Sequence, residues 1–377
     1  MENEVLGAYT WVARPEDLRR TVADLSHHAV LAVDTESNSL YAYQEQVCLI
    51  QFSTDQDDYL IDPLAIHDLS PIGPILGDPA IEKVFHAAEY DLICLKRDFG
   101  FQVRNLFDTM VACRILGREN VGLGSLLFEE FGLVIDKRYQ RANWGQRPLP
   151  PELLSYARLD THYLVALRDR LEAELKLRGR WELALEDFKR LEKTAVPSND
   201  HTNGSCWKIP GVHELSPRQL AVLLALCEYR DQRARRENLP HFKVLSNEIL
   251  LQIALVEPDS IDELYDIPHL SRRLVERHGE GLIAAVRRGK TSKPPRRPPA
   301  PPRPDDEYLI CLDALRSWRK LTGRELGVDS DIVLPRDVME LIAARRPSTL
   351  AELEPLMSDL PWRFQRLGRE IIAVLNR

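Results

Sequence analysis

The chain has 377 residues, with 58 acidic residues against 50 lysines and arginines, and its formal net charge is −8. Hydrophobic residues make up 44% of the sequence, which is enough to build packed cores and excludes a globally disordered protein. This length predicts two or three domains, because single cores rarely grow beyond about 250–300 residues.

Membrane-spanning and disulfide-rich classes find no support in the sequence. No run of 18 apolar residues occurs, and the chain begins Met-Glu-Asn-Glu without a positively charged leader. We expect neither a zinc knuckle nor a disulfide framework, because no Cys-x-x-Cys pair occurs among the scattered cysteines, which are Cys48, Cys94, Cys113, Cys206, Cys227 and Cys311. We therefore expect a cytoplasmic, reduced protein with no membrane partner.

Charge is distributed unevenly along the chain. Residues 1–200 contain 22 Lys and Arg against 33 Asp and Glu, a balance of −11, so the remaining 28 and 25 leave residues 201–377 at +3. Within this basic part, residues 287–303 carry seven basic residues, no acidic residue and many prolines, which disfavour helix and sheet. We expect an extended, positively charged linker there, and a softer boundary near residues 195–212, where turn-forming residues cluster.

In chain order, apolar runs first predict a series of strands. The first 65 residues are expected to form three strands with short connections, as in an antiparallel meander, at 28–33, 47–52 and 59–61. A fourth strand is expected over residues 83–86, and helices then follow at about 89–99, 108–117, 123–131, 150–160 and 161–178. This order predicts an α/β fold, a mixed sheet with helices packed on it, within a domain of residues 1–200.

The first predicted strand ends in the acidic tripeptide Asp34-Thr35-Glu36. Because side chains alternate along a strand, both carboxylates project from the same face. Two like charges side by side cost free energy unless a cation compensates them. The pair is therefore a candidate metal site, although Asp-x-Glu is a common pattern and a solvated strand end is the alternative.

Two further acidic positions follow along the chain. Asp91 lies just after the fourth strand, near the start of the next helix, where a carboxylate also complements the helix dipole. Tyr156 and Asp160 are four residues apart on a predicted helix, so phenol and carboxylate share one face and can reach one ligand. Each has a structural alternative: an ordinary N-terminal helix acid for Asp91, and a core position for Tyr156.

The C-terminal part of the chain repeats itself. At an offset of 89 residues, Ala225-Leu226 aligns with Ala314-Leu315 without gaps, and similar matches continue to the end of the chain. Apolar positions recur at helical spacing in both copies. We expect two similar all-helical domains of four or five short helices each, at 213–289 and 305–377, joined by a basic linker at 290–304.

Together, the acidic motifs resemble a known superfamily. Asp34-Thr-Glu36, His86-x4-Asp91 and Tyr156-x3-Asp160 look like the three exonuclease motifs of the DEDD superfamily, in its tyrosine-bearing branch. The surrounding residues resemble the ribonuclease D family and the nuclear exonuclease of the eukaryotic exosome, through Phe107-Asp-Thr109, Lys137-x-x-Gln140, Asn143-Trp144 and Arg147-Pro-Leu149. The resemblance covers about residues 10–190.

The helical repeat resembles a second module. Residues 213–289 are similar to an HRDC domain, which is shared by RecQ-type helicases and ribonuclease D, and residues 305–377 look like a more divergent copy. The two resemblances imply an α/β exonuclease domain with a ribonuclease H-like mixed sheet and flanking helices. Two small all-α HRDC-like domains would follow it.

The resemblance also implies an activity, the hydrolytic 3′→5′ removal of nucleotides from RNA as 5′-mononucleotides. In the family pattern, Asp34, Glu36, Asp91 and Asp160 hold two divalent metal ions, Mg²⁺ or Mn²⁺, and Asp34 bridges them. Hard ions of this kind prefer carboxylate oxygens. Tyr156 would orient the attacking water, because a phenol with a pKa near 10 is a poor base at neutral pH.

Seven residues are candidates for contacts to the substrate. Ser37 follows Glu36 where the family usually has a bulky residue, so Leu40 or Tyr41 is expected to hold the terminal base instead. His86 is expected either to contact the substrate or to pack at the strand end. The other candidates touch the RNA backbone or are structural, and they are Lys137, Gln140, Trp144 and Arg147. Asp108 is expected to cap a helix rather than to bind metal.

The expected substrate is the 3′ end of structured RNA, such as a tRNA precursor, and the expected state is a monomer. A DNA 3′→5′ exonuclease and a catalytically weak RNA-binding adaptor are the alternatives. The HRDC-like pair is expected to guide RNA, although a protein partner and a simply solvated face are alternatives. The arginines that favour guidance lie along one helix beside the basic linker, and they are Arg230, Arg233, Arg235 and Arg236.

Overall fold

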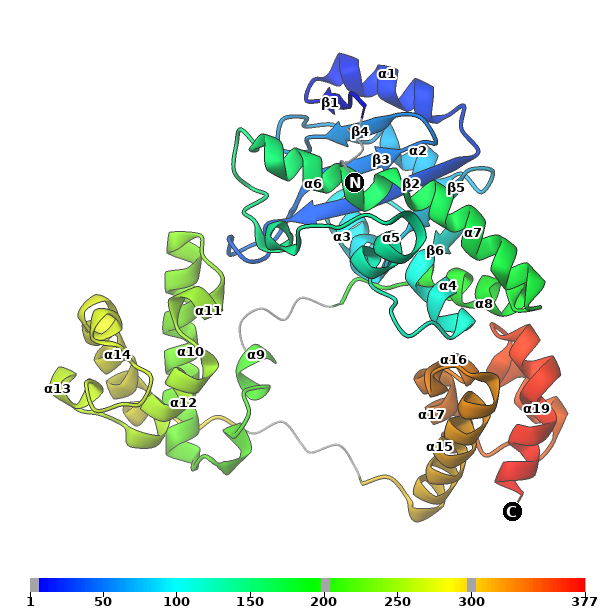
Figure 1. Ribbon diagram of the computed structural model, residues 1–377. Helices are drawn as coiled ribbons and strands as arrows, with labels where there is room; N and C mark the ends of the chain where they lie inside the picture. The colour runs from blue at the N-terminus through cyan, green and yellow to red at the C-terminus, as the bar shows by residue number, and fades with distance from the viewer. Residues whose placement is uncertain (1–6, 198–203, 297–302, 377) are drawn as a thin grey trace. The chain divides into compact units, whose positions relative to one another are not determined.

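The structure, a computed structural model, describes residues 7–197, 204–296 and 303–376. The chain divides into two compact units (Figure 1): the first contains residues 1–37, 47–196 and 302–377, and the second contains residues 38–46 and 197–301. Among the described helices, none combines the length and the apolar character that crossing a bilayer requires.

The first unit is built around a six-stranded sheet in the order β1-β4-β3-β2-β5-β6. Its strands are β1 (Thr10–Val12), β2 (Val30–Ser37), β3 (Val47–Ser53), β4 (Asp58–Ile61), β5 (Glu82–Phe85) and β6 (Leu106–Asp108). β2 pairs antiparallel with β3 and parallel with β5, and β3 pairs antiparallel with β4. The predicted meander is confirmed. The edge strands β1 and β6 escaped prediction because three residues carry too little periodicity.

Helices pack around this sheet (Figure 1). They are α1 (Pro15–Leu25), α2 (Ile72–Gly77), α3 (Glu89–Phe99), α4 (Thr109–Leu116), α5 (Leu123–Phe131), the 3₁₀ helix η1 (Lys137–Arg141), α6 (Pro151–His162), α7 (Leu164–Leu177) and α8 (Trp181–Leu191). The helices expected from residue 89 to 131 are confirmed as α3, α4 and α5. The last two expected helices are also present, but the break between them falls at Tyr163.

The expectation that the first 65 residues form strands alone is wrong, because α1 lies between β1 and β2. This helix starts with Pro15, which suits a first helical turn. Its buried residues are only Leu18, Thr21 and Leu25, and one of them is polar. The helical apolar pattern was therefore too sparse to be recognised.

Two apolar clusters hold the sheet and its helices together. The larger one joins the sheet to α1, α2, α3, α4 and α7. The smaller one lies beneath α6, where Leu49 and Leu60 of the sheet meet Leu153, Tyr156 and Ala157 of the helix. Through this smaller cluster, α6 packs on β2, β3 and β4.

The C-terminal bundles confirm the internal repeat helix by helix. The second unit contains α9 (Gly204–Trp207), η2 (Val212–Glu214), α10 (Pro217–Glu237), α11 (His241–Val244), α12 (Asn247–Val256), α13 (Ile261–Leu264) and α14 (Arg272–Thr291). The first unit contains α15 (Asp306–Leu326), α16 (Ser330–Val333), α17 (Arg336–Arg345), α18 (Leu350–Leu353), η3 (Glu354–Met357) and α19 (Pro361–Leu375). The helices α15 to α19 begin 89 residues after α10 to α14, from 217 and 306 to 272 and 361.

An arginine occupies the same place in both bundles, buried in the first copy and half-buried in the second. Arg230 on α10 donates to the carbonyl of Leu245 at 3.2 Å, and Arg319 on α15 donates to the carbonyl of Leu334 at 2.9 Å. Burial lowers the pKa of Arg230 to about 10. Arg230 is only 4% exposed, so it is a structural residue of the bundle and cannot serve RNA as the sequence suggested.

Within the first unit, the bundle that ends the chain docks on α8 through another buried arginine. Arg363 on α19 is fully buried, and its guanidinium pairs with Glu186 and Asp187 at 2.8 Å each. It also donates to the carbonyl of Ile332 at 3.0 Å. A charge buried this completely needs such partners, and the pairs join the terminal bundle to the sheet-bearing part of the unit.

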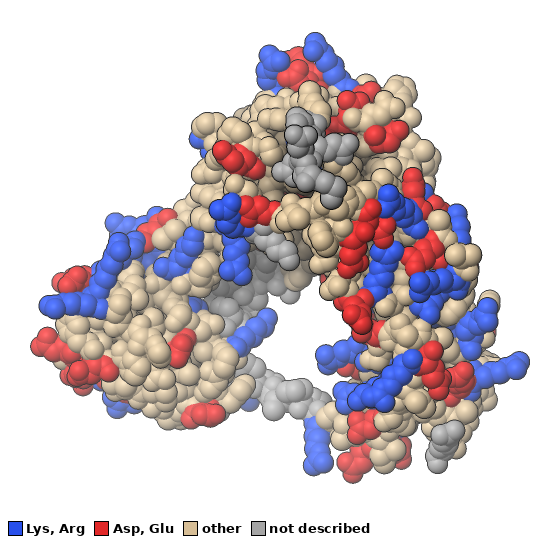
Figure 2. All heavy atoms as spheres, viewed as in Figure 1, with Lys and Arg blue, Asp and Glu red and all other residues tan. Residues whose placement is uncertain are grey.

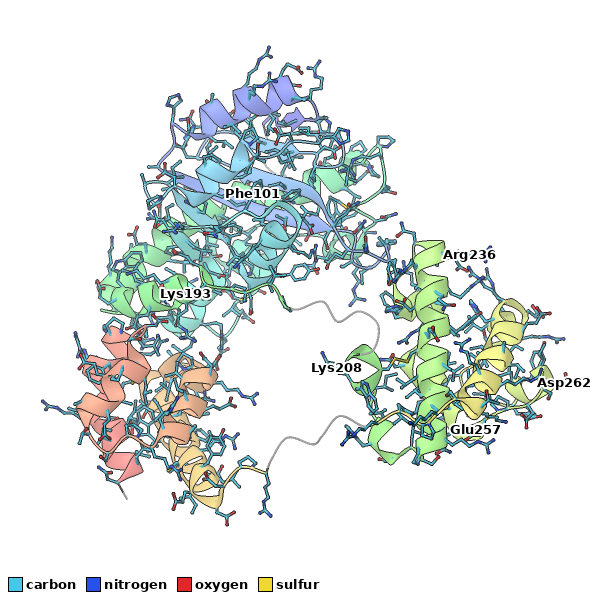
Figure 3. All side chains as sticks on the ribbon, turned by 180° about the vertical axis from the view of Figure 1, so that it is seen from behind. Phe101, Lys193, Lys208, Arg236, Glu257 and Asp262 are labelled. Carbon is cyan, nitrogen blue, oxygen red and sulfur yellow. A yellow bond between two sulfur atoms is a disulfide. The ribbon has the colours of Figure 1, made fainter. Side chains whose placement is uncertain are left out.

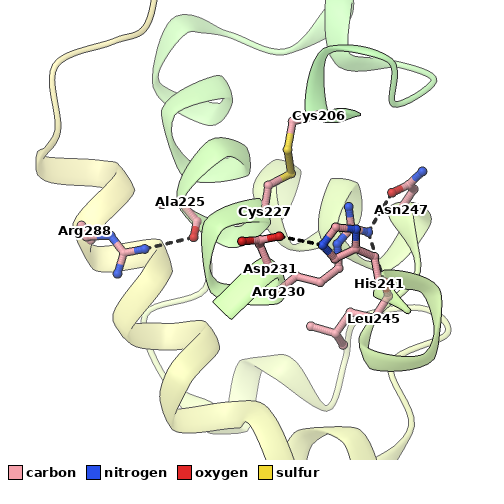
Figure 4. Close-up of a disulfide and its surroundings, with 9 residues drawn as sticks. All are labelled: Cys206, Ala225, Cys227, Arg230, Asp231, His241, Leu245, Asn247 and Arg288. Atoms are coloured by element: carbon pink, nitrogen blue, oxygen red, sulfur yellow. Dashed lines mark hydrogen bonds and ion pairs between the residues drawn. A yellow bond between two sulfur atoms is a disulfide. The ribbon is translucent and has the colours of Figure 1, made fainter. Parts of the chain in front are cut away.

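Two sequence expectations about the second unit are corrected. α14 extends to Thr291, so the basic stretch from residue 287 begins as helix, and residues 297–302 of the linker lie outside the described part. Cys206 on α9 and Cys227 on α10 form a disulfide (Figure 4). Their separation of 21 residues matches no recognisable motif, which is why no bridge was predicted.

Candidate active site

The two carboxylates of the first acidic motif lie near the carboxyl end of β2. Asp34 pairs across the sheet with Gln51 of β3, and Glu36 pairs with Leu49. Since paired residues project from the same face, and Leu49 packs beneath α6, both acids lie on the face that α6 covers. A β-bulge between Glu36 and Ser37 then interrupts the regular pairing.

Asp91 reaches the same place from the first turn of α3. It is 6% exposed, and its Oδ1 accepts hydrogen bonds from the backbone N–H of Thr35 at 3.1 Å and from the Thr35 hydroxyl. Thr35 stands between the two acids of β2, so these bonds tie the second motif directly to the first.

Asp108 stabilises the turn before α3 through backbone hydrogen bonds and is not one of the candidate metal ligands. Its buried carboxylate accepts hydrogen bonds from the backbone N–H groups of Ala87, Ala88, Met110 and Val111. The last two bonds cap α4, and the first two hold a turn in which Ala87 adopts a left-handed φ of 63°. The prediction that Asp108 is a helix cap is therefore confirmed.

α6 brings Tyr156 and Asp160 to the site, and Asp58 of β4 anchors this helix to the sheet. The Asp58 carboxylate accepts a hydrogen bond from Arg158 Nη2 at 2.8 Å, and His162 Nδ1 lies 3.0 Å from it. Arg158 and His162 both flank Asp160 on α6. Asp58 therefore fixes the rotation of the helix that carries the third motif.

The carboxylates form a donor set that fits divalent cations. Oxygens of Asp34, Glu36 and Asp160 lie within 4.8 Å of one another, and these residues line one cavity of about 420 Å³ together with Asp91 and Tyr156. Burial, and then repulsion from the neighbouring acids, raises the pKa of Asp34 and Glu36 well above their usual values. Burial raises the pKa of Asp91 and of Asp160 to about 7. Closely spaced, uncompensated carboxylates are the ligands that Mg²⁺ and Mn²⁺ prefer.

Tyr156 is a hydrogen-bond donor in this cavity. Burial and the nearby Asp160, Glu36 and Asp34 raise the pKa of its phenol, which therefore stays protonated at neutral pH. The phenol is hydrogen-bonded to Asp160. Its ring lies 6.2 Å from that of Trp144, centroid to centroid, so the two aromatic side chains are neighbours.

Of the predicted substrate contacts, His86 and Gln140 line the cavity. Burial lowers the pKa of His86 to about 4, so its ring is neutral, and Nδ1 lies 2.9 Å from the Thr109 hydroxyl. Leu40 and Tyr41 belong to the second unit and are not among the lining residues. The side chain of Lys137 lies outside the described part of the chain.

Trp144 is buried and Arg147 is paired within the protein, which favours their structural alternative. Trp144 is 1% exposed and packs beside Tyr156. Arg147 pairs with Asp62 at 2.6 Å and donates to the carbonyl of Cys48 at 2.7 Å. Both residues support the segment between η1 and α6.

Sequence reasoning did not single out several other lining residues, which are Ala87, Tyr90, Gly122, Leu123, Gly124 and Ile135. Tyr90 is 48% exposed, and its position next to Asp91 was the one signal that pointed to it. The glycines and Leu123 belong to the start of α5, and no pattern in the sequence distinguishes that turn as part of a site.

Comparison with known proteins agrees with this geometry. Residues 9–176 match a family described as 3′–5′ exonuclease, and residues 219–286 and 309–375 each match the HRDC domain. Ribonuclease D of Gluconacetobacter diazotrophicus is 30% identical over 375 residues, which cover 96% of this chain and 92% of that protein. The chain belongs to the ribonuclease D family.

The chain is also similar to eukaryotic proteins and to proteins of known structure. Protein RRP6-like 2 of Arabidopsis thaliana is 36% identical over 294 residues, which cover 74% of this chain but only 33% of that protein. The crystal structure of Escherichia coli RNase D has a TM-score of 0.70 at 26% identity, covering 98% of this chain and 99% of that one. The catalytic core of Trypanosoma brucei RRP6 has a TM-score of 0.66 at 30% identity, covering 76% and 81%.

Proposed function

We propose that this chain is a metal-dependent 3′→5′ exoribonuclease that hydrolyses the last phosphodiester bond of an RNA and releases a 5′-mononucleotide. The observation that supports the proposal is the gathering of four carboxylates and one phenol in a single cavity, namely Asp34, Glu36, Asp91, Asp160 and Tyr156. The family relationship supports the reaction class. The Escherichia coli RNase D is described as an exoribonuclease involved in structured RNA processing.

The carboxylates would hold two divalent ions, Mg²⁺ or Mn²⁺. When bound, such ions supply the positive charge that lowers the pKa of an attacking water and stabilises the leaving oxygen. Asp34 is repelled by Asp91, Asp160 and Glu36, so it lies close to the other three acids and would hold the ions together with them. Asp91 keeps its orientation through its hydrogen bonds to Thr35.

Tyr156 would position the attacking water rather than remove its proton. Its raised pKa keeps the phenol protonated at neutral pH, so the side chain can donate a hydrogen bond but cannot act as a base. The packing of its ring beside Trp144 limits the directions that the hydroxyl can take. His86, which burial keeps neutral, and Gln140 both line the cavity, and we propose that they contact the terminal nucleotide.

The proposed substrates are structured RNAs with an accessible 3′ end, such as tRNA precursors, and the proposed setting is a monomer in the cytoplasm. We also propose that the second unit attracts RNA. A cavity of about 840 Å³ beside α10 and α14 is lined by four basic side chains, Arg235, Arg236, Arg288 and Lys293, against two acidic ones, Glu228 and Asp231. Figure 2 shows both basic and acidic side chains on the visible face of this unit, and Figure 3 labels Arg236 near the end of α10.

The experiment compares matched 5′-labelled RNA and DNA oligonucleotides, with Mg²⁺ or Mn²⁺, as substrates of the full chain and two variants. Asp34→Asn should abolish the release of mononucleotides while RNA binding survives, because it removes one carboxylate of the cluster that would hold the ions. Asp57→Asn, a change of the same kind at an exposed site, should leave the rate unchanged. Faster cleavage of DNA than of RNA would refute the ribonuclease assignment, and unchanged release by Asp34→Asn would refute the metal role.

A further inference from the structure

Gln51 of β3 is a fully buried amide without a hydrogen-bond partner. Its exposed fraction is 0%, and among the described residues neither Nε2 nor Oε1 finds a partner. Leaving a buried polar group unpaired destabilises the folded state. Buried polar side chains in folded proteins are nearly always paired, so an amide with both atoms unpaired points to a partner that arrives only in the working state of the protein.

The sheet register places this amide next to the candidate metal site. Gln51 lies directly opposite Asp34 on β2 and opposite Leu60 on β4. Side chains directly opposite each other in an antiparallel pair have Cβ atoms about 4.5–5.5 Å apart and share one face of the sheet. Gln51 therefore shares the space beneath α6 with the carboxylate of Asp34.

The neighbours of Gln51 on this face leave it few other partners. Two residues along β3 in one direction, Ser53 is satisfied by Thr161 of α6 at 2.7 Å and by Asp58. Two residues in the other direction, Leu49 is apolar and packs beneath α6, and Leu60 across the strand pair is apolar as well. The polar group nearest to Gln51 in the register is the carboxylate of Asp34.

We propose that Gln51 is a positioning residue for Asp34, and that its side-chain N–H donates to the Asp34 carboxylate when divalent cations occupy the site. This inference rests on the proposed function, because it concerns the same cations. The hydrogen bond fixes the orientation of Asp34 and leaves its remaining lone pairs for the ions. Groups that orient metal ligands in this way typically contribute 10- to 100-fold to metal affinity.

The test measures Mn²⁺ binding to the full chain by calorimetry, together with the Tm of the metal-free protein. Gln51→Met keeps the length of the side chain and removes both polar atoms. It should weaken Mn²⁺ binding about 10- to 100-fold, while the metal-free Tm stays the same or rises because an unpaired amide is gone. Ile50→Val, on the same strand but the opposite face, should change Mn²⁺ affinity less than twofold.

An Mn²⁺ affinity of Gln51→Met within twofold of the parent would overturn the proposal and leave Gln51 as an ordinary buried residue. Should Gln51→Met fail to fold, nuclear magnetic resonance of the unmodified protein decides. The side-chain amide signals of Gln51 should shift on addition of diamagnetic Mg²⁺, and unchanged signals while Mg²⁺ binds would overturn the proposal. A parent chain that binds neither ion would refute the proposed function itself, which the two readouts separate from a failure at Gln51.

Discussion

Asp34, Glu36 and Asp160 place carboxylate oxygens within 4.8 Å of one another, and burial makes their shared negative charge costly. Clusters of acids with pKa values raised in this way are typical of functional sites. The raised pKa values are the residue-scale signature of this cost. Two uncharged residues lie beside these acids. Thr35 donates a hydrogen bond to Asp91, and Gln51 lies opposite Asp34 in the sheet.

A pH dependence of stability follows from these carboxylates. The pKa of Asp91 and Asp160 is about 7 in the folded protein against 3.8 for the ordinary side chain, so between about pH 4 and 7 the folded chain holds more protons than the unfolded one. The free energy of unfolding of the metal-free protein should therefore fall as pH rises through this window. Bound cations should reverse the trend, since ligands must be deprotonated to bind them.

The measurement is the Tm with and without saturating Mn²⁺ at about pH 5 and about pH 8. The gain in Tm on adding Mn²⁺ should be larger at the higher pH. Asp34→Asn provides the control, because its gain should be small at both values. An equal gain at the two pH values in the unmodified chain would contradict the assignment of these acids as metal ligands.

At the scale of elements, α6 carries the third motif. Both polar and apolar contacts hold this helix on the sheet. Burial alone would raise the pKa of Asp58, but the hydrogen bonds from His162, Ser53 and Arg158 outweigh it and leave the pKa lowered. The charged pair of Asp58 and Arg158 is nearly inaccessible, with side-chain exposures of 3% and 7%. The anchor therefore works only while both partners are present.

Asp58→Ala should lower the free energy of unfolding by about 3–5 kcal/mol, because it leaves the charge of Arg158 buried and unpaired. It should also lower kcat for mononucleotide release, since α6 loses the contact that sets the position of Tyr156 and Asp160. Urea unfolding and single-turnover cleavage give the two quantities. Asp57→Ala, one residue earlier and exposed, should stay within about 0.5 kcal/mol. A loss below about 1 kcal/mol for Asp58→Ala would show that the pair does not anchor α6.

The elements were predictable to the extent that their apolar patterns are dense. Continuous apolar runs predict the buried strands around Val33 and Ile50, and the matches at one offset predict the repeat. Asp58 follows the exposed turn of residues 55–57 and looks like one more surface acid in sequence. Its partner Arg158 lies 100 residues away, and only the folded sheet brings the two together.

The same limit applies to the site. The acids at Asp34, Glu36, Asp91 and Asp160 could be predicted because each stands in a short motif at a strand end or on a helix. The cavity residues of the α5 turn could not, since only the folded chain brings that turn to the same cavity as the acids of β2. The packed state of Trp144 likewise comes from tertiary contacts that no local pattern encodes.

At the scale of the whole molecule, the two helical bundles belong to different units although their sequences are similar. The terminal bundle is joined to the sheet by the buried Arg363 and belongs to the first unit, whereas the earlier bundle belongs to the second unit. The net charge of −8 averages residues 1–200, at −11, with residues 201–377, at +3. We propose that the second unit attracts RNA through the cavity beside α10 and α14.

Charge reversal tests this division of labour. Arg236→Glu should weaken binding of structured RNA, and the slope of log affinity against log salt should become shallower by about 0.7 for one lost phosphate contact. Lys208→Glu, an equal change of charge next to α9 in the same unit (Figure 3), should leave the slope unchanged. Equal effects of the two variants would indicate a general charge effect and contradict a specific RNA surface around Arg236.

The central claim is that four carboxylates of the first unit hold the metal ions of an exoribonuclease. A crystal structure of the full chain with Mn²⁺ and a 5′-mononucleotide tests it most directly, because anomalous scattering locates manganese independently of the protein atoms. The account predicts two manganese ions among Asp34, Glu36, Asp91 and Asp160, with the nucleotide phosphate beside them. Manganese absent from this cavity, or bound only elsewhere, would contradict it.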